Sequence, residues 1–281
     1  MQNGNFLFGC GAFDVLRYVN ATEESEKEKY GKRTKEWLDL FNYGTLPFYW
    51  GTYEPKEGDV RQAEMDKCVD FLTARGVTLK GHPLCWHTVC ADWLLSYDDK
   101  TIFEKQLERI NREVSHFKGK ITYWDVINET VILPVFNKYD NAVSRICARY
   151  GRMTLIKEVF AAAKAADPEA QLLINDFNTT DKYEKVIEEC LQAGVPIDAI
   201  GIQSHQHQGY WGAKKIKEVI ERFSRFGLPV HFTENTLLSG MLMPPEIEDL
   251  NDYQVESWDT VPFMEIRQQE DLAEMYGILL N

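Results

Sequence analysis

The feature that most constrains the fold is a repeated alternation of short apolar runs with longer amphipathic segments. At four places a glycine stands between the end of a helical pattern and the start of the next apolar run, at Gly76, Gly119, Gly194 and Gly227. Glycine just past a helix end adopts the left-handed conformation without a Cβ clash, so each of these positions marks a helix C-terminus. Repeated strand–helix units of this kind predict parallel strands joined by crossover helices.

Seven such units can be placed along the 281 residues. Strands are predicted near 6–12, 43–49, 77–84, 121–128, 171–176, 199–204 and 229–234. Helices are predicted near 26–41, 63–75, 101–117, 141–166, 181–193, 213–226 and 266–280. The expected fold class is α/β, a TIM barrel of the (β/α)8 type, with a single catalytic barrel domain over residues 1–281.

Two further expectations concern the C-terminal part of the sequence. The seventh helix reaches the last residues of the sequence, so the eighth unit of such a barrel, roughly 30 residues long, is expected to be absent. Residues 237–262, which contain Pro244-Pro245 and several acidic side chains, are expected to form one long loop after the seventh strand. Loops of this length in a compact domain are often functional.

Charge and composition limit the partners. A formal net charge of −13 disfavours binding to nucleic-acid phosphates but allows a neutral polysaccharide. No run approaches the roughly 18 apolar residues that a membrane span needs. The first residues show no basic segment followed by an apolar one, so no secretion signal is visible. The six cysteines form no C-x-x-C pair and are expected to be free thiols in or near the core.

Polar side chains gather where the predicted strands end. In barrels of this class, reactive side chains follow the carboxyl ends of the strands. Glu129 follows the fourth strand and Glu234 ends the seventh, so both carboxylates are expected at the same face. The other polar or aromatic residues at strand ends are His82, Trp86, His87, Asn128, Asn175, Asp176, Asn178, Gln203 and His205. Glycoside hydrolysis uses two such carboxyl groups, about 5–5.5 Å apart for retention and about 6.5–9.5 Å apart for inversion.

Several of these residues lie in motifs that resemble a known family. The segment Trp124-Asp125-Val126-Ile127-Asn128-Glu129 resembles the acid/base motif of glycoside hydrolase family 10, the endo-1,4-β-xylanases. Similar matches, in the family's order and over nearly the whole chain, are found at Gly81-His82-Pro83-Leu84-Cys85-Trp86-His87, Asn175-Asp176-Phe177-Asn178, Gly201-Ile202-Gln203-Ser204-His205 and Thr233-Glu234.

The resemblance implies a function and a role for each matched residue. It implies a retaining endo-1,4-β-xylanase that cleaves the xylan backbone by double displacement through a covalent glycosyl-enzyme intermediate, with no cofactor and no metal. Glu129 would be the general acid/base, Glu234 the nucleophile, and His205 the residue that holds Glu234. The implied substrate-binding residues are Tyr49, His82, Trp86, His87, Asn128, Asn175, Asn178 and Gln203. The resemblance also implies secretion.

Three positions depart from the family pattern. Tyr49 stands where the family has a sugar-binding lysine, so part of the sugar clamp is absent or built from aromatic side chains. Asn235-Thr236 follows the nucleophile in place of Leu-Asp, so the support of His205 is expected to differ. Phe177 replaces a common tyrosine.

Three other functions remain open. Another retaining β-1,4-glycanase, a glucanase or a mannanase, can share the two glutamates. A metal-dependent barrel hydrolase is suggested by His205 and His207, which alternate on one face of a strand, together with His82 and His87. A barrel that binds xylan without cleaving it is compatible with the altered Tyr49 position.

Overall fold

The computed structural model describes residues 6–247, 253 and 259–280. Two compact units can be separated, the first ending at Ala199 and the second beginning at Ile200. The single domain predicted over residues 1–281 stays a prediction. The predicted loop 237–262 falls partly on residues 248–252 and 254–258, which lie outside the described residues.

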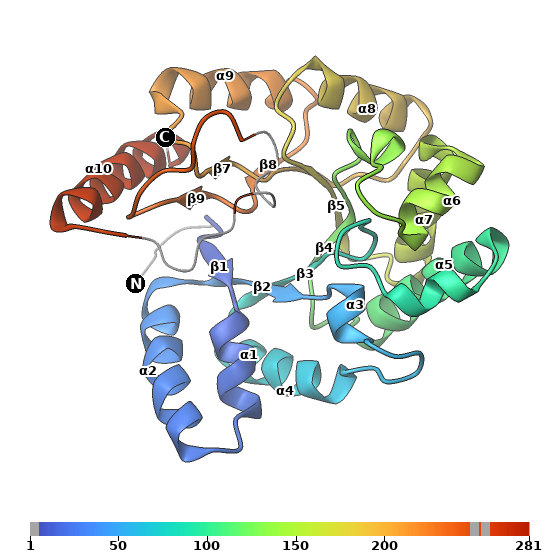
Figure 1. Cartoon of the computed structure of the whole chain (residues 1–281), viewed down its shortest axis with the longest axis horizontal. Helices are drawn as coiled ribbons and strands as arrows, with labels where there is room; N and C mark the ends of the chain where they lie inside the picture. Colours follow the sequence, from blue (N-terminus) through green and yellow to red (C-terminus); the bar gives the residue numbers. More distant parts are fainter. Residues whose placement is uncertain (1–5, 248–252, 254–258, 281) are drawn as a thin grey trace. The chain divides into compact units, whose positions relative to one another are not determined.

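The first unit contains a parallel sheet whose strands follow one another in chain order (Figure 1). The strands are β1 (Gly9–Gly11), β2 (Tyr43–Pro47), β3 (Thr78–His82), β4 (Tyr123–Asn128) and β5 (Gln171–Asp176). The register places Pro47 opposite His82 and Asn128 opposite Asn175. The C-terminal ends of β2 and β3 are therefore level with each other, as are those of β4 and β5, and the residues that follow these strands emerge at one edge of the sheet.

Helices connect these strands and lie along one face of the sheet (Figure 1). They are α1 (Phe13–Asn20), α2 (Glu24–Leu40), α3 (Trp50–Tyr53), α4 (Gln62–Thr73), α5 (Asp99–His116), α6 (Ala142–Tyr150), α7 (Arg152–Ala166) and α8 (Asp181–Gln192). Short 3-10 turns occupy Asp92–Ser96 and Leu133–Val135. Asp98 starts α5 by accepting the Thr101 amide at 2.8 Å, and Asn141 starts α6 by accepting the Ser144 amide at 2.8 Å, which satisfies amides that lack helical partners.

The burial pattern explains why these segments fold as they do. Strands β4 and β5 are buried at every position after their first residue, as expected for strands covered on both faces. Helix α7 buries the stripe Leu155, Ile156, Val159, Phe160 and Ala163, which has helical spacing. The hydrophobic effect of closing these apolar faces against each other holds the unit together.

The predicted helix 141–166 is wrong as one element, because the structure divides it into α6 and α7 at Gly151. Gly151 has φ 86° and ψ 145°, a conformation open to glycine but not to side-chain-bearing residues. Its amide still bonds the Cys147 carbonyl at 2.8 Å, so one residue ends α6 and precedes the first turn of α7. Helix α1 was not predicted from the sequence, and neither was the one-turn α3.

The second unit is smaller. Strand β6 (Ala199–Ile202), at the boundary, pairs in parallel with β8 (Val230–Phe232), and β7 (His205–Gln206) pairs in parallel with β9 (Thr236–Leu237). Helices α9 (Gly212–Ser224) and α10 (Pro262–Leu279) pack on them. Ile216, Leu237 and Met275 form the buried centre of this unit. The seven predicted strand–helix units are thus all present in the described part of the chain.

The four glycines predicted to end helices all have positive φ, between 70° and 75°. The six cysteines are free thiols, as predicted, with four buried, Cys90 half-buried and Cys10 exposed. Within the described ranges, no helix is long and apolar enough to span a bilayer.

Candidate active site

Glu129 follows directly on strand β4 in an unusual backbone conformation. Its φ is 60°, in the left-handed region that residues other than glycine rarely adopt. Two backbone hydrogen bonds hold this turn, from the Glu129 amide to the Asn175 carbonyl at 2.9 Å and from the Asn128 amide to the Cys85 carbonyl at 3.0 Å. Strained positions of this kind persist only where the surroundings enforce them and cluster at functional sites.

The Glu129 carboxylate is held by side chains from the segment after β3. The Trp86 indole Nε1–H donates to Glu129 Oε2 at 2.8 Å, and His87 Nε2 lies 3.6 Å from the same oxygen. His87 is buried, with its ring centroid 4.2 Å from that of Phe136. The side chain of Glu129 is 15% exposed, so this carboxylate is accessible while one of its oxygens is oriented by a directional donor.

His82 belongs to a buried polar group that also contains Lys80 and Asp125. His82 Nδ1 and Lys80 Nζ each lie 2.7 Å from Asp125 Oδ2. Burial opposes ionisation of Asp125, but the charge of Lys80 and the His82 hydrogen bond outweigh it and hold the pKa of Asp125 below its usual value. Because a carboxylate only accepts, His82 Nδ1 carries a hydrogen, and the imidazole orientation is thereby determined.

Asn128, Asn175 and Tyr49 are brought to the same strand ends. Asn175 Nδ2 donates to Asn128 Oδ1 at 2.8 Å, and both residues are buried. Tyr49 follows β2, and its ring centroid lies 5.6 Å from that of His82 and 5.8 Å from that of Trp86. Tyr49, His82 and Trp86, from two neighbouring strand ends, therefore form one aromatic group.

Asn178 has a local role in the loop after β5. Its side-chain oxygen accepts the Thr180 amide at 2.9 Å and the Thr180 hydroxyl at 2.8 Å. Its own amide donates to Asp176 Oδ1 at 2.9 Å. These contacts shape the entry into α8, and the substrate-binding role of Asn178 stays a prediction.

Asp176 ties this loop to the segment after Glu129. Asp176 Oδ2 accepts the Val131 amide at 3.0 Å and the Thr130 hydroxyl at 3.2 Å, and the carboxylate is fully buried. Burial raises the pKa of Asp176 to about 6, although the Asn178 and Val131 amides act in the opposite direction. The sequence marked this position as polar but did not indicate that it braces the turn carrying Glu129.

The raised pKa of Asp176 has a consequence for stability. From its ordinary value of 3.8 up to about 6, the folded protein retains a proton that the unfolded chain has released. The contribution of Asp176 to the free energy of unfolding therefore falls as the pH rises through this window. Between about pH 4 and pH 7, we expect the free energy of unfolding of the wild type to fall by up to about 3 kcal/mol relative to that of Asp176→Asn, as measured by urea unfolding. If the free energy of unfolding of the wild type minus that of the variant is constant or rises with pH, the expectation is contradicted.

In the second unit, Glu234 lies two residues beyond β8. The Thr233 amide donates to the Ile202 carbonyl at 2.8 Å and the Glu234 amide to the Gln203 carbonyl at 3.0 Å, which continues the pairing of β6 with β8. Gln203 is buried, and Ser204 has φ 60°, a left-handed turn that precedes His205. His205 Nε2 lies 3.2 Å from Glu234 Oε2, and the two side chains are 23% and 24% exposed.

Thr236 supports His205 from the other side. The β7–β9 register places Thr236 opposite His205, and Thr236 Oγ1 lies 3.5 Å from His205 Nδ1. The same hydroxyl lies 2.9 Å from the Glu234 carbonyl oxygen, to which it donates. The support of His205 therefore comes from a neutral hydroxyl, which agrees with the expectation that it differs from the family's aspartate.

His205 and His207 do not form a recognisable metal centre. Their rings stack with centroids 5.3 Å apart and planes at 21°. Burial, followed by the charge of His205, lowers the pKa of His207. In the part of the chain that is described, no group of three or more His, Cys, Asp or Glu side chains is arranged to hold a metal ion.

Sequence reasoning did not identify Lys80 and Asp125 as supports of these side chains, and it marked Thr236 only as part of a departure from the family pattern. A signal existed for Lys80, which shares a strand face with His82 two residues away and is an unusual charge inside an otherwise buried strand. Asp125 lies within the motif that ends in Glu129, but its partners come from β3 and are not evident from the sequence.

Parallel strand–helix units whose strands are ordered as in the sequence, with polar side chains following the strands' C-terminal ends, are typical of the class of (β/α) barrel proteins. A family model for glycosyl hydrolase family 10 matches residues 25–239, a range that includes both Glu129 and Glu234. The chain therefore belongs to glycosyl hydrolase family 10.

Curated relatives agree with this assignment. An endo-1,4-beta-xylanase/feruloyl esterase of Xylanibacter ruminicola is 30% identical over 234 residues, 72% of this chain and 32% of that protein. A beta-1,4-xylanase of Dictyoglomus thermophilum is 32% identical over 196 residues, 66% of this chain and 53% of that protein. The chain thus spans between about a third and about half of the length of these two relatives.

Solved structures establish the fold class. A family 10 structure from Paenibacillus barcinonensis superposes with a TM-score of 0.76 at 24% identity, covering 98% of this chain and 79% of that one. Native xylanase 10B from Thermotoga maritima superposes with a TM-score of 0.70 at 23% identity, covering 96% of this chain and 77% of that one. These structures are TIM barrels, so the predicted (β/α)8 barrel class is confirmed.

Proposed function

We propose that this chain is a retaining endo-1,4-β-xylanase, with Glu129 as general acid/base and Glu234 as nucleophile. The substrate is the xylan backbone or a xylo-oligosaccharide, and the reaction is a double displacement through a covalent glycosyl-enzyme intermediate. No cofactor takes part in this mechanism.

One observation carries the proposal. The chain belongs to glycosyl hydrolase family 10, and Glu129 and Glu234 each follow the C-terminal end of a parallel strand. A ring nitrogen orients one carboxylate oxygen of each glutamate: Trp86 Nε1 lies 2.8 Å from Glu129 Oε2, and His205 Nε2 lies 3.2 Å from Glu234 Oε2. Carboxyl groups held in this way can serve as acid and nucleophile without reorganising during the reaction. Two relatives whose names describe xylanases add support.

In the first step, Glu129 gives its proton to the glycosidic oxygen while Glu234 attacks the anomeric carbon. Because Trp86 donates to Glu129 Oε2, we assign the transferable proton to Oε1. The bond from the anomeric carbon to the leaving oxygen breaks, and an ester bond to Glu234 forms. His205, 3.2 Å from Glu234 Oε2, orients the attacking carboxylate.

In the second step, Glu129, now ionised, removes a proton from water, and the water oxygen attacks the anomeric carbon. The ester bond to Glu234 breaks, and both carboxyl groups return to their initial states. Two inversions at one carbon give net retention of configuration.

Substrate binding is assigned to the side chains around the two glutamates. Asn128, oriented by Asn175, and His82, oriented by Asp125, present fixed polar groups to sugar hydroxyls. Trp86 and Tyr49 offer apolar rings to the C–H face of a sugar. His87, Asn178 and Gln203 complete the proposed set.

The proposal is tested by the products formed from polysaccharides. The purified chain is incubated with xylan, glucomannan and a soluble cellulose derivative, and the first product from xylohexaose is followed by proton NMR. We expect xylo-oligosaccharides from xylan, with the β-anomer appearing first. An α-anomer first would exclude retention, preference for glucan or mannan would indicate another β-1,4-glycanase, and binding without product would indicate a binding barrel.

A further inference from the structure

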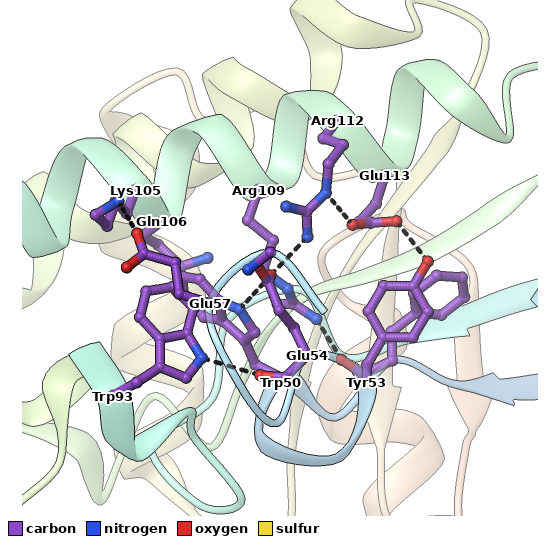
Figure 2. Close-up of polar contacts among 12 residues, drawn as sticks. Trp50, Tyr53, Glu54, Glu57, Trp93, Lys105, Gln106, Arg109, Arg112 and Glu113 are labelled. Atoms are coloured by element: carbon purple, nitrogen blue, oxygen red, sulfur yellow. Dashed lines mark hydrogen bonds and ion pairs between the residues drawn. The ribbon is translucent and has the colours of Figure 1, made fainter. Parts of the chain in front are cut away.

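Helix α5 buries an unusual set of polar side chains against the segment after β2. Gln106, Arg109 and Glu113 are each at most 2% exposed. Figure 2 shows Arg109 and Arg112 extending from α5 toward the segment that carries Trp50, Tyr53 and Glu54. A buried charge is costly unless it is paired and hydrogen-bonded, so such a group calls for a structural or functional reason.

Arg109 bonds backbone carbonyls rather than a carboxylate. Its Nη1 donates to the Leu84 carbonyl, and its Nη2 donates to the Phe48 carbonyl. Gln106 Nε2 also donates to the Leu84 carbonyl, at 3.1 Å. Phe48 and Leu84 lie just beyond the ends of β2 and β3, so one guanidinium joins two consecutive strand–helix connections.

These two carbonyls belong to residues that lie one and two positions before residues of the proposed active site. Phe48 precedes Tyr49, and Leu84 is two residues before Trp86, whose indole donates to Glu129 at 2.8 Å. The chain between them is held by the Leu84 amide, which donates to the Asp125 carbonyl at 2.9 Å, and by the Cys85 carbonyl, which accepts the Asn128 amide at 3.0 Å. Arg109 is thus linked to the Trp86–Glu129 contact by two residues of chain, and the backbone of Leu84 and Cys85 is itself hydrogen-bonded to β4.

The charge of Arg109 is balanced nearby. Burial lowers the pKa of Arg109, and the negative charge of Glu113 acts against that shift. The Tyr53 hydroxyl donates to Glu113 Oε2 at 2.8 Å, and Arg112 Nε donates to Glu113 Oε1 at 2.6 Å (Figure 2). The planar fork of a guanidinium can reach two carbonyls at once, which a lysine ammonium cannot do with the same geometry.

We infer that Arg109 is a positioning residue of the proposed active site. It joins the connections after β2 and β3 and so sets where the Trp86 N–H meets Glu129. This inference rests on the proposed roles of Trp86 and Glu129, but its structural part can be tested without any substrate.

The test compares Arg109→Lys and Arg109→Met with Arg112→Met. Arg112 lies one turn further along α5 and bonds Glu54 and Glu113, at 2.8 Å and 2.6 Å, but no carbonyl of the two connections. It is therefore a matched control for disturbance of the ion network. Two quantities are measured: kcat and KM on an aryl β-xylobioside, and hydrogen exchange of the Trp86 indole N–H, assigned by its loss in Trp86→Phe.

We expect both Arg109 variants to lower kcat by roughly 10- to 100-fold with a smaller change in KM, because a displacement of about 1 Å is enough for such a loss. Exchange of the Trp86 N–H should accelerate in the same variants, and both quantities should stay near wild type in Arg112→Met. Unchanged kcat and exchange in a folded Arg109→Lys would overturn the inference. Equal losses in Arg112→Met would overturn it too, because the network would then act only on the fold.

Two outcomes are kept separate by the design. If the wild type does not cleave the xylobioside, the proposed function fails while indole exchange still decides whether Arg109 positions Trp86. If neither Arg109 variant folds, Arg109→Gln, a neutral side chain that can donate to one carbonyl but cannot join both, replaces them. Faster Trp86 exchange in that variant supports the inference, and wild-type exchange overturns it.

Discussion

Replacing Glu234 by alanine is expected to lower kcat on xylo-oligosaccharides by about 10⁴-fold or more, on the scale seen when a covalent nucleophile is removed. Without this carboxylate no ester to the enzyme can form, whatever the leaving group. The loss should therefore be equally severe on substrates with good and poor leaving groups. Initial rates on xylobiosides whose phenols differ in pKa measure this directly.

Added azide makes the prediction for Glu234 specific. A small anion can occupy the space of the missing carboxylate and attack the anomeric carbon once, so the product should be the α-glycosyl azide, of inverted configuration. Glu221→Ala, which removes an exposed carboxylate from α9 in the same unit, is the control and should keep wild-type rates. Near-wild-type turnover by Glu234→Ala would refute the assignment.

Replacing Glu129 by alanine should give a loss that depends on the leaving group. For a poor leaving group, kcat/KM should fall by roughly 10²- to 10⁴-fold, the range supplied by general acid catalysis. For a dinitrophenyl leaving group, which needs no proton, formation of the intermediate should be little affected and its hydrolysis should become rate-limiting. A burst of released phenol, followed by slow turnover, is the expected time course.

The azide product distinguishes the role of Glu129 from that of Glu234. In Glu129→Ala the anion should attack the glycosyl-enzyme intermediate, restore turnover and give the β-glycosyl azide, of retained configuration. Glu158→Ala, an exposed carboxylate on α7, is the matched control. An α-azide from Glu129→Ala would mean that the two roles are exchanged.

The success of the fold prediction has a local cause. The glycines at 76, 119, 194 and 227 each end a helix through a conformation that depends on the residue itself, so the sequence reports it directly. Gly151 also has a positive φ and ends α6. The helical spacing of apolar residues continues across it from α6 to α7, so the sequence pattern predicted one helix where the structure has two. Helix α1 was missed because Val15 is its only fully buried residue, and its packing against α2 and α4 is what holds it.

For the site, the sequence by itself determined which side chains follow the strand ends, because consecutive parallel strands finish at one edge of the sheet. That is enough to name Glu129, Glu234 and most of the polar residues near them. Only the tertiary structure decided how each is held: Trp86 donates to Glu129 across 43 residues of sequence, and Arg109 reaches the Phe48 carbonyl across 61. The reason is physical. Helix ends follow from local conformational preferences, whereas these hydrogen bonds depend on how neighbouring strands pair and how helix α5 packs on the sheet, which no short segment of the chain encodes.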